Sequence, residues 1–145
     1  MTINIITHNK RAHLDLLLLA DESETMIADY LDRGTLFALS YDDLRSVCVV
    51  TDEGDGICEL KNLATYEKFQ HQGYATALVA HICRHFAATH HTMHVGTGGK
   101  TVAFYAQCGF TVYEVLKDYF TDHYAAPIIE DGVQIFDRIN LKKHL

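Results

Sequence analysis

The chain has 145 residues, of which 48% are hydrophobic and 21% charged, with a single proline. This composition indicates one globular domain, residues 1–145, with enough residues for a substantial core, and it excludes a disordered chain. The formal net charge of −7, with ten histidines taken as neutral, argues against a nucleic-acid partner, because neutralising phosphates requires a face rich in Lys and Arg.

The N-terminus and the cysteines predict a cytoplasmic protein without a membrane anchor. No charged start followed by a long apolar core marks a signal peptide, and the apolar run at residues 14–20 is too short to span a bilayer. Cys48, Cys58, Cys83 and Cys108 stand singly beside apolar residues, without a CxxC pair. Buried free thiols are therefore expected instead of disulfides or a zinc ribbon.

The first half of the chain predicts strands and helices in alternation. The expected elements are a strand at 3–7, a helix over about 9–20, a helix between Ser23 and Gly34, strands at 35–41 and 44–51, and a strand at 57–65. In the first helix, Leu14, Leu17 and Leu18 would form one apolar stripe. Ser23 is a good N-cap for the second helix, and Gly34 a good residue to end it.

The second half predicts a long amphipathic helix and a C-terminal β-rich region. The expected elements are a helix from Gly73 to about residue 89, a strand at 92–95, a glycine loop at 96–99, a short helix at 100–108, a β-rich segment at 110–120 and an alternating strand at 133–141. A regular helix or strand would not tolerate so many glycines, so these residues are expected to form a loop. This order predicts one α/β (α+β) domain around a mixed sheet.

The best-defined feature is the segment of residues 58–78, where an apolar strand passes through a polar turn into the helix after Gly73. Such a turn exposes backbone N–H groups, with the positive end of the helix dipole behind them. That arrangement binds phosphate, so we expect an anion site for a nucleotide-like cofactor. A GxxxxGK[ST] motif is absent and the glycine follows a mid-chain strand, which disfavours a nucleoside triphosphatase and a dinucleotide-binding unit.

Three motifs in this order resemble the GNAT superfamily of N-acetyltransferases. Gln70-His71-Gln72-Gly73-Tyr74-Ala75 is similar to its pyrophosphate loop Q/R-x-x-G-x-G/A, Leu63-Ala64-Thr65 stands where its cofactor strand reads L-x-V, and residues 104–110 match F-Y-x-x-x-G-F. The resemblance covers nearly the whole chain and implies a mostly antiparallel sheet of roughly six to seven strands with about four helices. His71 and Gln72 replace small or basic loop residues, which weakens the charge complement more than the geometry.

The resemblance implies acetyl-CoA as co-substrate and no metal. In this superfamily the cofactor strand and its neighbour splay apart, and the pantetheine arm bonds to the exposed backbone as an added strand would. The N–H of Thr65 would then supply the oxyanion donor. The implied cofactor-binding residues are Leu63, Ala64, Thr65, Gln70, His71, Gln72, Gly73, Tyr74, Ala75, Thr76 and Phe104.

Glu59 and Tyr105 are the candidate catalytic residues. Glu59 lies two periods of side-chain alternation before Leu63, where the histone-acetyltransferase branch has a glutamate that serves as base, and it is expected among apolar neighbours. The alternatives are a solvent-facing glutamate, or one that binds the acceptor ammonium without taking its proton. Tyr105 matches the tyrosine that protonates the departing thiolate in many members; the alternative is a core tyrosine packed with Phe104.

The acceptor is expected to be a small-molecule or peptide amine. Asp21, Glu22 and Glu24 lie between the first two predicted helices and would attract a cation, although a solvated acidic turn that merely caps the second helix is the commoner explanation of such a pattern. The histidine pair His81 and His85 flanks the apolar helix face without a completing carboxylate or cysteine, which disfavours a zinc site.

These patterns together predict an acetyl-CoA-dependent N-acetyltransferase that uses direct transfer, because none of the cysteines has an evident histidine partner. The protein would be a monomer or homodimer, without nucleic-acid or membrane partners. Two alternatives remain: a non-catalytic acyl-CoA-binding sensor or partner module of the same fold, and an acyltransferase for a longer acyl group or a hydroxyl acceptor.

Overall fold

A seven-stranded sheet carries helices on both faces in the computed structural model, which describes residues 1–145. The strand order is β1-β2-β3-β4-β5-β9-β6, and β4 and β5 form its only parallel pair. The elements in chain order are β1 (Thr2–Ile6), α1 (Leu14–Leu17), α2 (Glu24–Arg33), β2 (Thr35–Tyr41), β3 (Asp43–Gly54), β4 (Ile57–Thr65), α3 (Tyr74–Phe86), β5 (Thr92–Thr97), α4 (Thr101–Gln107), β6 (Thr111–Leu116), α5 (Tyr119–His123), β7 (Ile128–Glu130), β8 (Val133–Ile135) and β9 (Arg138–His144). The predicted fold class is confirmed, with five α-helices where about four were expected.

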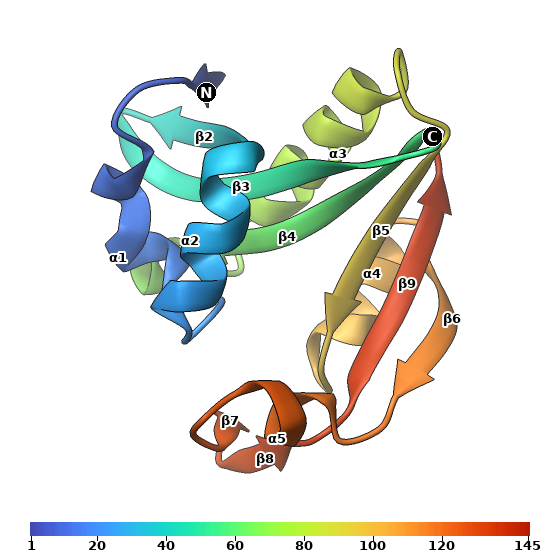
Figure 1. Ribbon diagram of the computed structural model, residues 1–145. Helices are drawn as coiled ribbons and strands as arrows, with labels where there is room; N and C mark the ends of the chain where they lie inside the picture. Colours follow the sequence, from blue (N-terminus) through green and yellow to red (C-terminus); the bar gives the residue numbers. More distant parts are fainter.

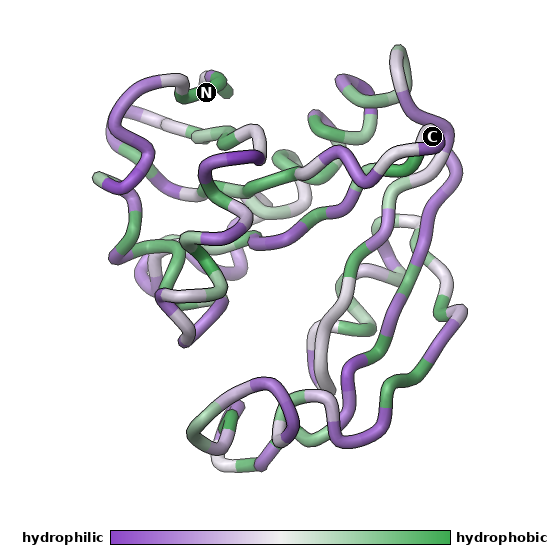
Figure 2. Tube along the Cα trace, viewed as in Figure 1, coloured by the Kyte–Doolittle hydropathy of each residue, from purple (hydrophilic) through white to green (hydrophobic).

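The helices divide the core into two parts. In Figure 1, α1 and α2 cover one face of β2, β3 and β4, while α3 lies on the opposite face and α4 behind β5 and β9. A cluster of 16 buried residues lies on the α3 and α4 side, and a cluster of 10 lies under α1 and α2. Figure 2 shows hydrophobic stretches along α3 and the central strands, with hydrophilic residues concentrated in the turns. None of the helices is long and apolar enough to cross a membrane.

The start of the chain is less helical than its pattern predicts. A 3₁₀ turn (Lys10–His13) precedes α1, which ends at Leu17, so the helix predicted over residues 9–20 was wrong in length. The buried leucines are Leu16 and Leu17, whereas Leu14 and Leu18 are only partly buried. With so short a helix, the two residues that face β4 are neighbours in sequence and no long stripe can form.

Other predicted boundaries agree more closely. The Ser23 side chain accepts a hydrogen bond from the Met26 N–H, as expected of an N-cap, and α2 ends before Gly34. β4 spans the predicted residues 57–65.

The predicted C-terminal strand was wrong. Residues 133–141 belong to two strands in different sheets: β8 forms a hairpin with β7, and β9 belongs to the main sheet. Likewise, the predicted β-rich segment ends at Leu116, and Tyr119 begins α5.

A β-bulge at Lys61 determines which side chains of β4 face which core. Val49 pairs with Asn62 and Val50 with Leu60, which leaves Lys61 as an extra residue. Before the bulge Leu60 packs into the α3 side, and after it Leu63 does, so the alternation changes phase. Glu59 and Leu63, which simple alternation would place on one face, therefore point to opposite faces of the sheet.

The parallel pair β4 and β5 separates midway and leaves an opening in the sheet. Their pairing runs from Ile57 with Thr92 to Leu60 with Val95 and then stops, although β4 continues to Thr65. Figure 1 shows the two strands diverging, with α5 and the β7–β8 hairpin at the wide end. The splaying implied by the family resemblance is thus present, and it exposes backbone N–H and C=O groups of β4.

Candidate active site

Two cavities flank the opening between β4 and β5, one on each face of the sheet. The larger, of about 690 Å³, lies on the α3 and α4 side, and the smaller, of about 250 Å³, lies on the α2 and α5 side. The larger volume is typical of sites for cofactors and other drug-sized ligands.

The larger cavity collects most of the residues predicted to bind the cofactor. Ten of the predicted site residues line it: Leu63, Thr65, Gln70, His71, Gly73, Tyr74, Ala75, Thr76, Phe104 and Tyr105. Ala64 does not, because it is buried against α1 and α2, and Gln72 does not, because its side chain points back to the Lys68 carbonyl oxygen, 3.2 Å away. The two motifs at residues 63–76 and 104–105 are thus brought together in one site.

The loop before α3 owes its shape to backbone conformation. Gly73 is the N-cap of α3 with φ of 88°, in the left-handed region that favours glycine, and a Cβ there would meet nothing within 4 Å. No side chain caps this 13-residue helix, so its first-turn N–H groups have no intrahelical partner. They lie at the wall of the larger cavity and, with the helix dipole, form a site suited to an anion.

One cation lines this cavity and a second lies behind its wall, both from elements that the motif does not include. Lys100, just before α4, lines it and pairs with Asp131 of the β7–β8 turn. The Arg45 guanidinium, from β3, lies 3.9 Å from the centroid of the Phe69 ring and donates a hydrogen bond to the Tyr74 hydroxyl at 3.1 Å. These side chains supply positive charge that His71 and Gln72 do not, and no local pattern near the loop could have revealed them.

Tyr105 lies in the larger cavity with 7% of its surface exposed. Burial, with smaller contributions from the Cys48 and Cys108 thiols, raises the pKa of the phenol well above its ordinary value, so the hydroxyl stays protonated. A protonated phenol can donate to a thiolate, but the same burial makes the transfer less favourable because it disfavours the phenolate. Tyr105 also packs edge-on against Phe104 and Phe110, as a core residue would.

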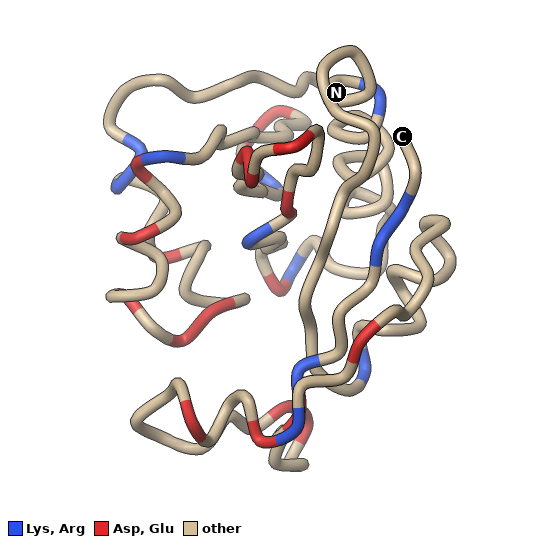
Figure 3. The backbone as a smooth tube through the Cα atoms, turned by 45° about the vertical axis from the view of Figure 1, so that its right-hand side comes forward, with Lys and Arg blue, Asp and Glu red and all other residues tan.

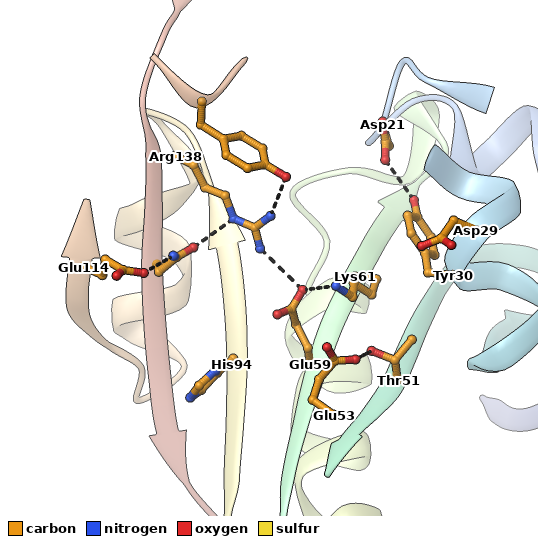
Figure 4. Close-up of polar contacts among 12 residues, drawn as sticks. Asp21, Asp29, Tyr30, Thr51, Glu53, Glu59, Lys61, His94, Glu114 and Arg138 are labelled. Atoms are coloured by element: carbon orange, nitrogen blue, oxygen red, sulfur yellow. Dashed lines mark hydrogen bonds and ion pairs between the residues drawn. The ribbon is translucent and has the colours of Figure 1, made fainter. Parts of the chain in front are cut away.

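The smaller cavity is lined by charged and phenolic side chains, with Glu59 at its centre. The Glu59 carboxylate lies 2.5 Å from Lys61 Nζ and 3.4 Å from Arg138 Nη2 (Figure 4). Its side chain is only 14% exposed. The expectation of apolar neighbours was wrong, because the neighbours of the carboxylate are Lys61, two residues later on the same face of β4, and Arg138 from β9.

Arg138 connects β9 to β4 by passing over β5 next to the point where the β4–β5 ladder ends. From β9 its guanidinium donates to Asn140 Oδ1 at 2.8 Å, to the Tyr119 hydroxyl at 3.2 Å and to Glu59. It crosses β5 at Gly96, where a Cβ would collide with the guanidinium. This contact corrects the predicted loop at residues 96–99, since Gly96 and Thr97 belong to β5 and the glycine makes room for Arg138.

Carboxylates outnumber cations around the smaller cavity. Its acidic residues are Asp21, Glu22, Asp29, Glu59 and Glu130, and its basic residues are Lys61 and Arg138. Figure 3 shows acidic positions on the segments at both sides of the opening, namely the α1–α2 connection and the C-terminal region. Glu24, predicted with Asp21 and Glu22, does not line the cavity. The excess of negative charge favours a cationic ligand.

Asp21 organises the wall of this cavity next to α2. It accepts hydrogen bonds from the Tyr30 hydroxyl at 3.1 Å, the Tyr124 hydroxyl at 3.0 Å and the Ser23 N–H at 3.0 Å. Burial, followed by the nearby Asp21 charge, raises the pKa of Tyr124, so the phenol remains a donor. Asp21 therefore ties the α1–α2 connection to the segment after α5, which closes the cavity from the far side.

The histidines that could suggest a metal site are used in packing. His81 and His85 both lie edge-on against Phe37. No group of three or more His, Cys, Asp or Glu side chains is placed to hold a metal ion. All four cysteines are free thiols, and Cys108 alone among them is partly exposed.

Comparison with known proteins matches both the sequence and the fold to acetyltransferases. A family model described as an acetyltransferase (GNAT) domain matches residues 32–112. An uncharacterized N-acetyltransferase of Bacillus subtilis, YvbK, is 33% identical over 134 residues, which cover 88% of this chain and 85% of that protein.

Solved structures extend the match to nearly the entire chain. A GNAT family acetyltransferase from Elizabethkingia anophelis with acetyl-CoA bound has a TM-score of 0.94 and 32% identity, covering 99% of this chain and 97% of that one. A Bacillus subtilis acetyltransferase in complex with CoA has a TM-score of 0.90 and 30% identity, with the same coverage.

Proposed function

Because this chain belongs to the GNAT family of acetyltransferases, we propose that it transfers the acetyl group of acetyl-CoA directly to a primary amine of a cationic small molecule or peptide. The observation that carries this proposal is the pair of cavities on opposite faces of the sheet, next to the opening between β4 and β5. One cavity is suited to a phosphate-bearing cofactor and the other to a cation, so the two substrates would meet at the opening.

Acetyl-CoA would occupy the larger cavity. Its pyrophosphate would accept hydrogen bonds from the first-turn N–H groups of α3, as such groups do with phosphates elsewhere. The pantetheine arm would pair with the unpaired edge of β4 from Leu63 to Thr65, which explains why the side chains there need not match the family consensus. The related proteins with acetyl-CoA or CoA bound support acetyl-CoA as the cofactor.

The amine would enter from the smaller cavity and meet the thioester at the opening. Direct transfer requires loss of a proton from the ammonium, a donor for the developing oxyanion and a proton for the departing thiolate. We assign the oxyanion donor to the backbone of β4 near Thr65 and the thiolate proton to Tyr105. Glu59 faces the acceptor side, either as the base or, through its pairs with Lys61 and Arg138, as the residue that fixes this wall. The acceptor is an amine, because carboxylates dominate the cavity that would hold it.

Release of free thiol from acetyl-CoA in the presence of amines tests the proposal. The panel comprises 1,4-diaminobutane, an aminoglycoside and a lysine-containing peptide, and we expect turnover with at least one of them. Glu59→Gln and Tyr105→Phe should both lower kcat, while CoA still raises the Tm of each variant. Stabilisation by CoA without turnover on any amine would instead identify a non-catalytic acyl-CoA-binding module.

A further inference from the structure

Glu130 is the one residue that lines both cavities. It is the last residue of β7, in the hairpin at the wide end of the opening between β4 and β5. Its carboxylate therefore lies between the larger cavity, beside the loop before α3, and the smaller, acidic cavity beside α2. None of the three GNAT motifs includes Glu130, and the sequence alone assigned it no role.

The hairpin is fixed against the turn between β5 and α4. Asp131 forms an ion pair with Lys100, and Ile135 packs so closely on Gly98 that a Cβ there would collide with it. Glu130 Oε2 lies 4.0 Å from the position that a Cβ on Gly99 would take. The carboxylate thus lies close to the two glycines of this turn, which carry no side chains, and it lines the cavity on each side of the opening.

The charges around Glu130 leave it without a cationic partner of its own. Asp131 on the hairpin and Glu22 from the α1–α2 connection are like charges, and Lys100 is the nearby cation, already paired with Asp131. Partial burial, then the Asp131 and Glu22 charges, raise the pKa of Glu130, and Lys100 opposes them. Such a carboxylate gains from a nearby ammonium and accepts a proton more readily than an ordinary glutamate.

Glu59 differs from Glu130 in its charged neighbours. Its carboxylate already pairs with Lys61 at 2.5 Å and with Arg138 at 3.4 Å. These contacts suit a residue that fixes the wall of the smaller cavity, whereas Glu130 has no such cation of its own to hold.

We propose that Glu130 binds the acceptor ammonium at the junction of the two cavities and takes its proton, while Glu59 positions Arg138 and Lys61. This proposal rests on the proposed function. The ammonium gives one proton to the Glu130 carboxylate, and the free amine forms a C–N bond to the thioester carbon as the C–S bond breaks. The nitrogen loses its second proton to solvent water, the Tyr105 phenol protonates the departing thiolate, and the phenolate regains a proton from solvent. The products are the amide and the thiol of CoA, and Glu130 returns its proton to solvent.

The test compares pH–rate profiles of Glu130→Gln, Glu59→Gln and a control, Asp122→Asn. Asp122 is exposed on α5 and lines neither cavity. The acceptor is whichever amine of the panel wild-type protein acetylates fastest. Glu130→Gln should lower kcat on the order of 10²-fold and abolish the acidic limb of the kcat/KM profile. Glu130→Asp should restore part of the rate. Glu59→Gln should be slower than wild type but keep the acidic limb, and Asp122→Asn should match wild type.

The possible outcomes separate this proposal from the proposed function. Wild-type rates and an unchanged acidic limb in Glu130→Gln would overturn the role of Glu130 while acetyl transfer stands. Loss of the limb in Glu59→Gln alone would overturn it in favour of Glu59. Absence of turnover by wild-type protein with every amine would overturn both. The rise in Tm on adding CoA should be equal in wild type and Glu130→Gln; its loss in the variant would show that the residue serves the cofactor and would overturn the proposal.

Discussion

The walls of the two cavities beside the opening consist of different groups, backbone in the larger cavity and side chains in the smaller. The larger one presents backbone groups of a strand edge and a helix N-terminus, contributed mainly by one continuous segment from Leu63 to Thr76. The smaller one presents charged and phenolic side chains from the α1–α2 connection, α2, β4, β9 and the segment from α5 to β7. Ligand binding in the larger cavity should therefore tolerate changes of side chain and be lost when the backbone is disturbed. Binding in the smaller cavity should respond to every change of charge.

The largest expected effect is on the backbone-built cavity. Gly73→Asp places a side chain and a negative charge beside the first-turn N–H groups of α3, and we expect CoA to bind at least roughly 100-fold more weakly, about 2.7 kcal/mol. The measurement is isothermal titration with CoA.

Gly54→Asp is the matched control for this change. Gly54 has φ of 83° and open space around its Cβ position, as Gly73 does, but it lies at the end of β3 and lines neither cavity. Both variants should lose about 1–2 kcal/mol of stability from left-handed strain, while only Gly73→Asp loses CoA affinity. Equal affinity losses in the two would show that strain, and not the phosphate site, is responsible.

A second, smaller effect is expected from changing the contact between Arg138 and Gly96 at the smaller cavity. Gly96→Ala displaces the Arg138 guanidinium from its path across β5, so kcat/KM for the amine should fall on the order of 10- to 100-fold with CoA affinity kept. Arg138→Met should have a similar effect. Because both changes break one contact, the double variant should be little worse than either single one. Additive losses would mean that Gly96 and Arg138 act separately.

The different construction of the cavities also explains how much could be predicted from the sequence. The order of β4, loop and α3 was predictable because it depends on local patterns: alternation, a glycine and an amphipathic helix. Most residues that line the larger cavity could be predicted together because they belong to one continuous stretch of the chain. Tyr105 joined it through a motif with its own helix and glycine.

The residues that line the smaller cavity could not be predicted in the same way. Arg138 lies in β9, which the alternating pattern at residues 133–141 merged with β8, and Glu130 lies in β7, for which no strand was predicted. The positions of these side chains next to Glu59 and Gly99 were therefore unforeseeable. The bulge at Lys61 leaves no sequence signal, yet it reverses the faces of Glu59 and Leu63. Side chains that meet across distant segments become visible only once strand register is known.

The smallest expected effect separates cavity charge from overall charge. Glu22 lines the acceptor cavity, whereas Glu24, two residues later in the first turn of α2, does not. Glu22→Gln should raise the KM for a cationic amine about two- to fivefold, the range of a single partly solvated ion pair, and Glu24→Gln should leave it unchanged. Steady-state kinetics at low and high salt provide the check, because the Glu22 effect should shrink as salt screens it. Both substitutions remove one negative charge from a chain of formal charge −7, so an equal effect would mean that general attraction, and not the cavity, draws in the amine.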